Sequence, residues 1–141
     1  MNFLLIEDDD DHALIITRNL EENRISNGVV RLADGEQALN YLFRRSPFEN
    51  ANRPDIILLD LKLPKVDGLE VLRQIKEDAQ LSLIPVVVLT TSDAESDRTR
   101  AYGFHVNSYL VKPVDFEKFK RMVVDLSLYW GVWNKPAPTQ G

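Results

Sequence analysis

The 141-residue sequence predicts an α/β fold in which helices cover both faces of a parallel sheet. Three short runs, at 3–6, 55–59 and 85–89, are mostly apolar and lack the alternation of a half-exposed strand, so they are typical of strands buried on both faces. The segments between them place apolar residues three or four positions apart, which is the spacing of one helix face. Alternating strands and helices with right-handed crossovers form a doubly wound sheet.

The remaining elements follow from the same two spacings. Weaker strands are predicted at 29–33 and 106–111. The segment 93–102 has few apolar residues, so its helix is expected from the alternation alone and should be the least firmly anchored. Four further helices rest on these apolar positions: Ala13, Ile16 and Leu20; Ala38 and Leu42; Leu69, Leu72 and Ile75; and Phe116, Phe119, Val123 and Leu126.

Composition and charge narrow the class of protein. The chain is 44% hydrophobic and 28% charged, which is typical of one soluble domain, and it has no cysteine for disulfides, thiolate metal sites or nucleophilic catalysis. A net charge of −5 is unfavourable for nucleic-acid binding, which depends on neutralising phosphates. There is neither a signal-peptide pattern nor a run of about 18 apolar residues. We therefore expect a cytoplasmic protein that contacts neither nucleic acid nor membrane.

Ligands of doubly wound sheets bind outside the carboxyl ends of the strands, so the residues that follow each strand are the candidates for chemistry. Four of the predicted strands end in acidic, hydroxyl or basic residues: Glu7 and Asp8, Asp60, Thr90 and Thr91, and Lys112. Carboxylates gathered at one edge repel each other unless a cation offsets them, and hard oxygen ligands suit Mg²⁺. The sequence therefore predicts a magnesium site at this edge.

The same edge has the groups that phosphoryl transfer requires. Asp60 stands alone after the most apolar strand and is the candidate nucleophile, which would become an acyl phosphate. A metal ion, the Lys112 ammonium and the Thr90 hydroxyl could hold the oxygens of the transferred group.

Five strings, in this order, carry a resemblance to a known family: LLIED at 4–8, ILLDLKLP at 57–64, DG at 67–68, VLTT at 88–91 and YLVKP at 109–113. With them the chain resembles a response-regulator receiver domain of two-component systems over residues 2–126. The resemblance implies a flavodoxin-like (βα)₅ sandwich with strands in the order 2-1-3-4-5. We expect a receiver domain at 1–128 and an aromatic, proline-containing tail at 129–141.

The resemblance also implies a role for each residue at the predicted edge. Asp60 becomes the phosphoacceptor. Mg²⁺ is held by Asp8, by Asp60 and by the backbone carbonyl of Lys62, with Glu7 acting through water. Phosphate binding and switching fall to Thr90, Thr91, Lys112 and Tyr109, and the bond before Pro113 is expected to be cis.

The family also implies the partners. The phosphoryl donor would be a sensor histidine kinase, and the response would be altered partner binding or dimerisation. The long segment at 44–53 and the aromatic tail resemble the small response regulators that pair with bacterial phytochromes, which would make the kinase a photoreceptor.

The tail and the end of the last helix leave two interpretations open. Tyr129, Trp130 and Trp133 are large aromatic residues beside proline-rich sequence, and they need something to cover them. Met122, Leu126 and Tyr129 are expected on a different helix face from Phe119 and Val123. The tail could pack on its own domain, but methionine and aromatic enrichment favours a homodimer.

Two other functions fit part of this pattern. A degenerate receiver would serve only as an interaction module, but it should lack an essential residue, and Asp8, Asp60, Thr90 and Lys112 are all present. A Mg²⁺-dependent phosphatase of the haloacid-dehalogenase type needs a second Asp two residues after the nucleophile, where Lys62 stands. The chain is therefore expected to catalyse only its own phosphorylation and dephosphorylation.

Simpler roles are expected for the other polar residues of this region. Asp9, Asp10 and Asp11 fit the start of a helix, where the helix dipole favours acids. His12 and His105 are expected at the surface, or as residues whose hydrogen bonds are already met.

Overall fold

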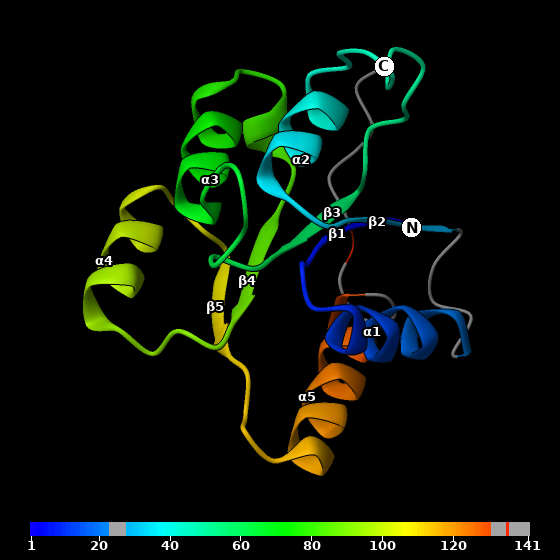
Figure 1. Ribbon diagram of the computed structural model, residues 1–141, viewed down its shortest axis with the longest axis vertical. Helices are drawn as coiled ribbons and strands as arrows, with labels where there is room; N and C mark the ends of the chain where they lie inside the picture. The colour runs from blue at the N-terminus through cyan, green and yellow to red at the C-terminus, as the bar shows by residue number, and fades with distance from the viewer. Residues whose placement is uncertain (23–27, 131–134, 136–141) are drawn as a thin grey trace.

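The computed structural model describes residues 1–22, 28–130 and 135. The elements alternate along the chain (Figure 1). In order they are β1 (Asn2–Ile6), α1 (Asp10–Glu22), β2 (Gly28–Leu32), α2 (Gly35–Leu42), β3 (Ile56–Leu59), α3 (Gly68–Glu77), a short 3₁₀ helix (Leu81–Leu83), β4 (Val86–Thr90), α4 (Glu95–Gly103), β5 (Ser108–Val111) and α5 (Phe116–Leu128).

The five strands are all parallel and lie in the order β2-β1-β3-β4-β5, so the predicted fold class and strand order are confirmed. β3 and β4 are buried along their whole length, as expected of central strands covered on both faces. The helices divide into two groups, with α1 and α5 on one face of the sheet and α2, α3 and α4 on the other (Figure 1).

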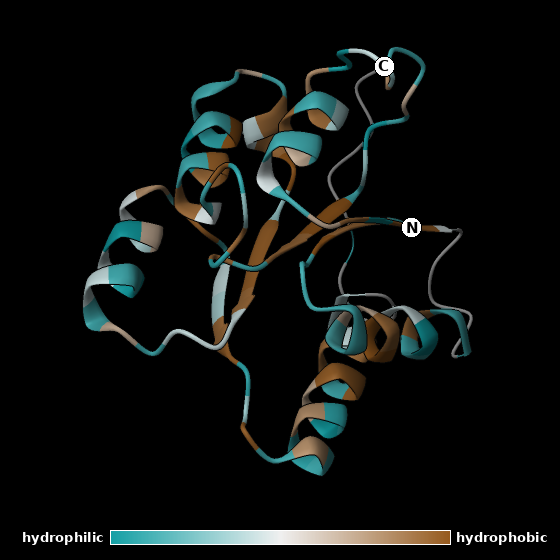
Figure 2. Ribbon diagram, in the orientation of Figure 1, coloured by the Kyte–Doolittle hydropathy of each residue, from teal (hydrophilic) through white to brown (hydrophobic). Residues whose placement is uncertain are grey.

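Successive strand residues point to opposite faces, which divides the core in two. Alternate strand residues, such as Leu4 and Ile57, pack with α2 and α3, whereas their neighbours, such as Leu5 and Leu58, pack with α1 and α5. Figure 2 shows the hydrophobic strands between helices whose outer faces are hydrophilic. No helix of the described ranges has both the length and the apolar character needed to cross a membrane.

α4 has the weak anchoring expected from its composition. Ala101 is its one buried residue, although the helix runs over nine residues. The other helices bury a full apolar stripe, as α3 does with Leu69, Leu72 and Ile75. Little apolar burial holds α4 in place, so its position depends on polar contacts at its N-terminal end.

The end of α5 differs from the sequence expectation. Leu126 and Trp130 are 7% and 8% exposed and join Phe119 and Val123 in the core beneath α5. These four positions follow the i, i+4, i+7, i+11 spacing of one helix face, so the prediction that Leu126 lies on a different face was wrong. Met122 is partly buried against the same core.

Tyr129 and Trp133 are the two other aromatic residues that the sequence placed in the tail or at a dimer contact. Tyr129 is 56% exposed, with its ring edge-on to Trp130. Trp133 lies outside the described residues.

Candidate functional site

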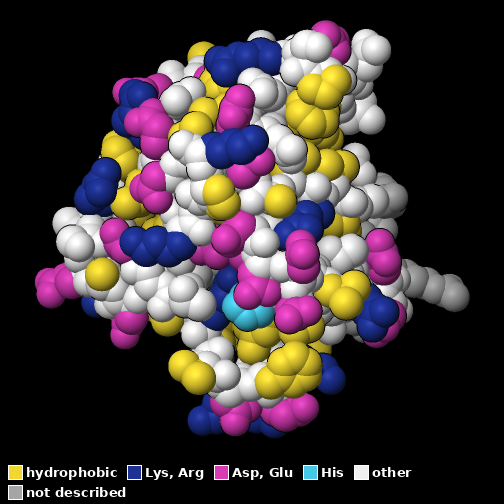
Figure 3. Space-filling view, in the orientation of Figure 1, with side chains coloured by type: hydrophobic (Ala, Val, Ile, Leu, Met, Phe, Trp, Pro, Cys, Tyr) yellow, Lys and Arg dark blue, Asp and Glu magenta, His cyan; other side chains and the backbone are white. Residues whose placement is uncertain are grey.

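The loops at the carboxyl ends of the strands bring the predicted polar residues together. Glu7 and Asp8 follow β1, Asp60 follows β3, Thr90 ends β4 and Lys112 follows β5. Backbone pairing aligns these ends, because the N–H of Asp60 donates to Ile6 and the N–H of Lys112 donates to Thr90. Figure 3 shows acidic side chains clustered near the centre of this face, with basic ones on either side.

Three carboxylates form a group that fits a divalent cation. Glu7, Asp8 and Asp60 each offer a ligand atom, and these atoms all lie within 4.8 Å of one another. Glu7 and Asp60 are buried, whereas Asp8 is exposed, so water could complete a coordination shell from its side. Lys62 belongs to the same turn, because its N–H donates to Asp60 Oδ1 at 3.2 Å.

Lys112 is the cation that balances this group in the protein itself. Its side chain is 2% exposed and forms an ion pair with Glu7 Oε1. Its Nζ also lies 3.3 Å from Asp60 Oδ2 and 3.0 Å from His12 Nδ1. A buried ammonium between two carboxylates is positioned to stabilise negative charge that develops at Asp60.

The electrostatics of the site are most visible at Glu7. Burial raises the pKa of Glu7 to about 8, and the charge of Asp60 adds to the rise, whereas the hydrogen bond and charge of Lys112 oppose it. In the absence of metal, Glu7 therefore retains a proton at pH values where an exposed glutamate is ionised. A cation at this site would have to displace that proton.

The raised pKa of Glu7 should make the stability of the metal-free protein depend on pH. Between about pH 4.5 and 8 the folded state holds a proton on Glu7 that the unfolded chain has released, so the free energy of unfolding falls as pH rises. The slope should be at most about 1.4 kcal/mol per pH unit. Urea unfolding in EDTA at pH 5, 6, 7 and 8 measures it. Glu7→Gln should flatten the curve, and an unchanged slope in that variant would exclude Glu7 as the cause.

The acidic run after Glu7 is held by local contacts. Asp9 caps α1, with its Oδ1 accepting from the N–H groups of Asp11 and His12 at 2.9 and 3.0 Å, so its predicted helix-start role is confirmed. Arg31 of β2 donates from Nε to the Glu7 carbonyl at 2.8 Å and pairs with Asp10 at 2.9 Å. The guanidinium therefore holds both ends of the loop that carries the carboxylates.

Thr90 and Thr91 occupy different environments. Thr90 is fully buried, and its hydroxyl oxygen accepts from the Ser92 N–H at 3.3 Å, whereas Thr91 is exposed. Tyr109 donates its hydroxyl hydrogen to the Ser92 carbonyl at 3.0 Å. Both residues expected to switch therefore contact the loop that follows β4.

Sequence reasoning missed a polar chain that joins this loop to the loop of Asp60. The Ser92 hydroxyl donates to Asp97 of α4, and Asp97 also pairs with Lys62 Nζ at 3.3 Å. These contacts hold the N-terminal end of α4, whose apolar anchoring is weak. No pattern in the sequence distinguished Asp97 from the neighbouring charged residues of its helix.

The expectation of a cis bond before Pro113 was wrong. The cis X-Pro bond of the described residues is Ser46–Pro47, whereas Lys112–Pro113 is trans. The trans form is the more stable one for most X-Pro bonds, and Lys112 reaches both carboxylates with it.

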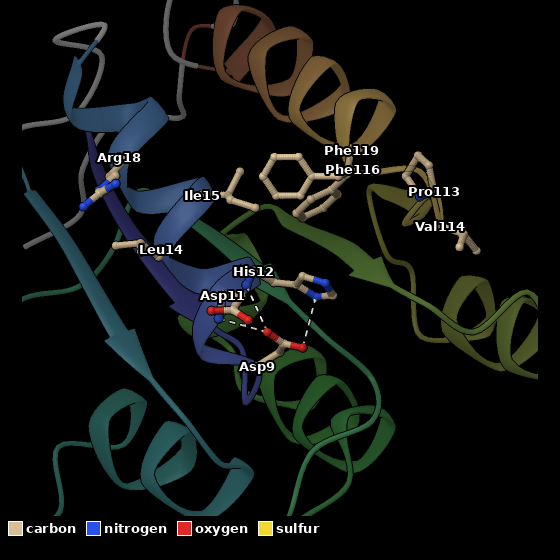
Figure 4. Close-up of a pocket in the computed structure, with 10 residues that line it drawn as sticks. All are labelled: Asp9, Asp11, His12, Leu14, Ile15, Arg18, Pro113, Val114, Phe116 and Phe119. Atoms are coloured by element: carbon tan, nitrogen blue, oxygen red, sulfur yellow. Dashed lines mark hydrogen bonds and ion pairs between the residues drawn. The ribbon is translucent and has the colours of Figure 1, made fainter.

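A cavity of about 430 Å³ lies between α1 and the segment that joins β5 to α5 (Figure 4). Its lining includes His12, Ile15, Pro113 and Phe116. Of the two roles expected for His12, the second applies, because its Nδ1 has a hydrogen-bond partner in Lys112 Nζ at 3.0 Å. It lies between the site and this cavity, and its ring packs at 4.9 Å from that of Phe119.

A five-stranded doubly wound sheet with buried Asp and Lys side chains and an acidic triad at its carboxyl edge is the arrangement expected of a phosphoacceptor signalling domain. The chain belongs to the response regulator receiver domain family, whose model matches residues 3–124. As a member of this family it has a phosphoacceptor role in two-component signalling.

Two relatives cover nearly all of the chain. It is 49% identical to the probable methanogenesis regulatory protein FilR2 of Methanothrix harundinacea over 136 residues, which cover 96% of this chain and 87% of that protein. It is 41% identical to the response regulator Rcp1 of Synechocystis sp. over 127 residues, which cover 90% of this chain and 86% of Rcp1.

Two solved structures share the fold closely. The crystal structure of the Mn²⁺-bound form of Rcp1 matches with a TM-score of 0.95 and 38% identity, covering 97% of this chain and 99% of that one. The phosphorylated cyanobacterial phytochrome response regulator RcpA matches with a TM-score of 0.93 and 38% identity, covering 97% and 98% of the two chains.

Proposed function

We propose that this receiver domain accepts a phosphoryl group from the phosphohistidine of a sensor kinase onto Asp60, with Mg²⁺ as its cofactor. The observation that carries the assignment is the position of Asp60. Its buried carboxylate lies 3.3 Å from the Lys112 ammonium and within a group of three carboxylates that fits a divalent cation.

Mg²⁺ would be held by Asp8, Asp60 and the Lys62 carbonyl, with Glu7 acting through water, and it would neutralise charge on the phosphoryl oxygens. Asp60 attacks phosphorus, the bond from phosphorus to the imidazole nitrogen breaks, and the electron pair leaves with the imidazole. The product is an acyl phosphate on Asp60. Lys112 balances the added negative charge, because its contacts with Glu7 and Asp60 already hold the ammonium beside the acceptor.

The switch follows from the loops that the acyl phosphate would contact. We assign phosphate binding to Thr90 and Lys112, with Thr91 beside them, and a change of packing to Tyr109. Because Ser92 bonds to Thr90, Tyr109 and Asp97, a shift of Thr90 would disturb all three contacts at once. The weakly anchored α4 would then move.

We assign the chain a signalling role without turnover of small substrates, since Lys62 stands where a dehalogenase-type acid/base would be needed. Its charge of −5 favours a protein partner over nucleic acid or an anionic membrane surface. We also assign the chain to the cytoplasm, because the catalytic part of a sensor kinase, its proposed partner, lies there. We assign that kinase to the phytochrome type, because RcpA is a phytochrome response regulator.

The alternative partner is a sensor kinase that is not a phytochrome, since FilR2, at 49% identity, is a probable methanogenesis regulatory protein. Phosphotransfer from purified kinases of both types would separate the two.

We further assign the active form to a homodimer. Its contacts would use the exposed residues Val124 and Leu128 of α5 and Tyr129, which follows the helix.

Intact mass after incubation with acetyl phosphate tests the function. We expect a gain of one phosphoryl group with Mg²⁺ and none with EDTA. Without the charge of the metal, the carboxylates around Asp60 repel the negatively charged phosphoryl donor. The added group should be released by hydroxylamine, as expected of an acyl phosphate. Light scattering on the product tests the dimer. No mass gain with either acetyl phosphate or a kinase would leave the chain as an interaction module.

A further inference from the structure

Lys112 has a third partner that the proposed chemistry does not use. The ammonium carries three N–H donors, and three acceptors surround it: Glu7 Oε1, Asp60 Oδ2 and His12 Nδ1. The first two belong to the carboxylate group. The third comes from the first turn of α1, and its distance from Nζ is 3.0 Å.

The chemistry of the pair decides which atom donates. An ammonium has three hydrogens and no lone pair, so His12 Nδ1 must be the acceptor. The nearest carboxylate to Nδ1, that of Asp9, is 3.8 Å away, which is too long for a hydrogen bond. His12 is therefore neutral in this arrangement, with its hydrogen on Nε2.

His12 is itself held in place. Its backbone N–H donates to Asp9 Oδ1 at 3.0 Å, and its ring packs against Phe119 of α5 with ring centroids 4.9 Å apart. Figure 4 shows the imidazole projecting from the start of α1, with Asp9 on one side and Phe119 on the other. A ring fixed on two sides presents Nδ1 to Lys112 in one orientation.

We propose that His12 is a positioning residue for Lys112, whose ammonium it orients toward Asp60 by accepting one of its three N–H groups. With that N–H taken by His12, the ammonium cannot rotate freely, and its other two N–H groups remain directed at Glu7 and Asp60. When a phosphoryl group arrives on Asp60, one of these two passes to a phosphoryl oxygen. The proposal rests on the proposed function of Asp60.

Two substitutions separate the acceptor from the ring. His12→Asn places Oδ1 the same number of bonds from Cβ as Nδ1, so it keeps an acceptor and loses the ring. His12→Phe keeps a ring against Phe119 and loses the acceptor. His105→Asn serves as the matched control, because His105 is exposed and its positive φ of 61° suits Asn.

Phosphorylation rates with acetyl phosphate at saturating Mg²⁺ give the first readout. We expect His12→Phe to lower the rate about three- to tenfold, the worth of one hydrogen bond, and His12→Asn to stay within about twofold of the wild type. The Mg²⁺ concentration for half-maximal rate should be unchanged in both. Equal rates for the two variants would overturn the proposal, because the acceptor would then make no difference. A slower His12→Asn would overturn it in favour of a packing role for the ring.

Imidazole ¹⁵N spectra of the unphosphorylated protein give a second readout that needs neither a substitution at His12 nor a phosphoryl donor. The chain has two histidines, and the His105→Asn spectrum identifies the resonances of His12. At a pH where the ring is neutral, we expect a bare Nδ1 and a protonated Nε2. A hydrogen on Nδ1 would overturn the proposal. Failure of the wild type to gain a phosphoryl group would instead contradict the function of Asp60.

Discussion

Asp60→Asn is expected to abolish phosphorylation of the protein. A carboxamide is too weak a nucleophile to form the acyl phosphate, and it takes one negative charge from the carboxylate group that would bind the metal. With acetyl phosphate and Mg²⁺, intact mass should show one added phosphoryl group in the wild type and none in the variant. Mg²⁺ affinity, measured by calorimetry, should also fall.

Asp67→Asn is the matched control. Asp67 lies at the start of α3, is exposed and makes no side-chain capping hydrogen bond, so the same chemical change should leave phosphorylation intact. A phosphoryl group that still appears on Asp60→Asn would move the acceptor to another residue, which peptide mapping would identify. Asp8 would be examined first, since its carboxylate lies in the same group.

Lys112→Met is expected to slow phosphorylation about 10²- to 10³-fold, or about 3–4 kcal/mol, the usual effect of removing a preorganised donor from developing charge. Methionine fills a similar volume in this buried position but leaves Glu7 and Asp60 without their cation. Because Lys112 lowers the pKa of Glu7, the variant should also take up a proton there more strongly. Single-turnover phosphorylation rates measure the first effect, and NMR titration of Glu7 measures the second.

Lys118→Met removes an exposed lysine of α5 and controls for the change in net charge. It should leave the phosphorylation rate and the pKa of Glu7 at their wild-type values. A Lys112→Met variant that is phosphorylated at the wild-type rate would remove Lys112 from the transfer step and would leave it a structural ion pair.

The pH dependence at Glu7 and the role of Lys112 are two aspects of one arrangement. Glu7 and Asp60 cannot both be ionised and buried at low cost, so a proton on Glu7, the ammonium of Lys112 or a metal ion must offset them. Adding Mg²⁺ should therefore release a proton near neutral pH. The affinity for the metal should rise as pH rises toward 8, whereas the free energy of unfolding of the metal-free protein falls over the same range.

The architecture and the residues of the site follow from local patterns. The runs at 3–6, 55–59 and 85–89 are apolar on both faces, and such runs have few alternatives to central parallel strands. A strand that ends in Asp60 or Lys112 must then present that side chain at the common edge, because all carboxyl ends of a parallel sheet point the same way.

Contacts between elements distant in sequence could not be read from these patterns. His12 and Lys112 are 100 residues apart, and only the packing of α1 against α5 brings the imidazole to the ammonium. The Lys62–Asp97 pair likewise depends on how α4 sits beside the loop of Asp60. Leu126 was assigned to the wrong face because the helix stripe continues through Trp130, beyond the end of α5 at Leu128.

The sequence by itself therefore determined the class of fold, the edge at which the chemistry lies and the residues that bear charge there, because apolar periodicity and strand ends are local properties. Tertiary structure alone decided how those charges are shared. It buried Glu7 beside Asp60 and placed Lys112 between them, with His12 holding the third N–H of its ammonium. Coulombic and hydrogen-bond energies depend on distances of a few ångströms between groups that the chain brings together only by folding.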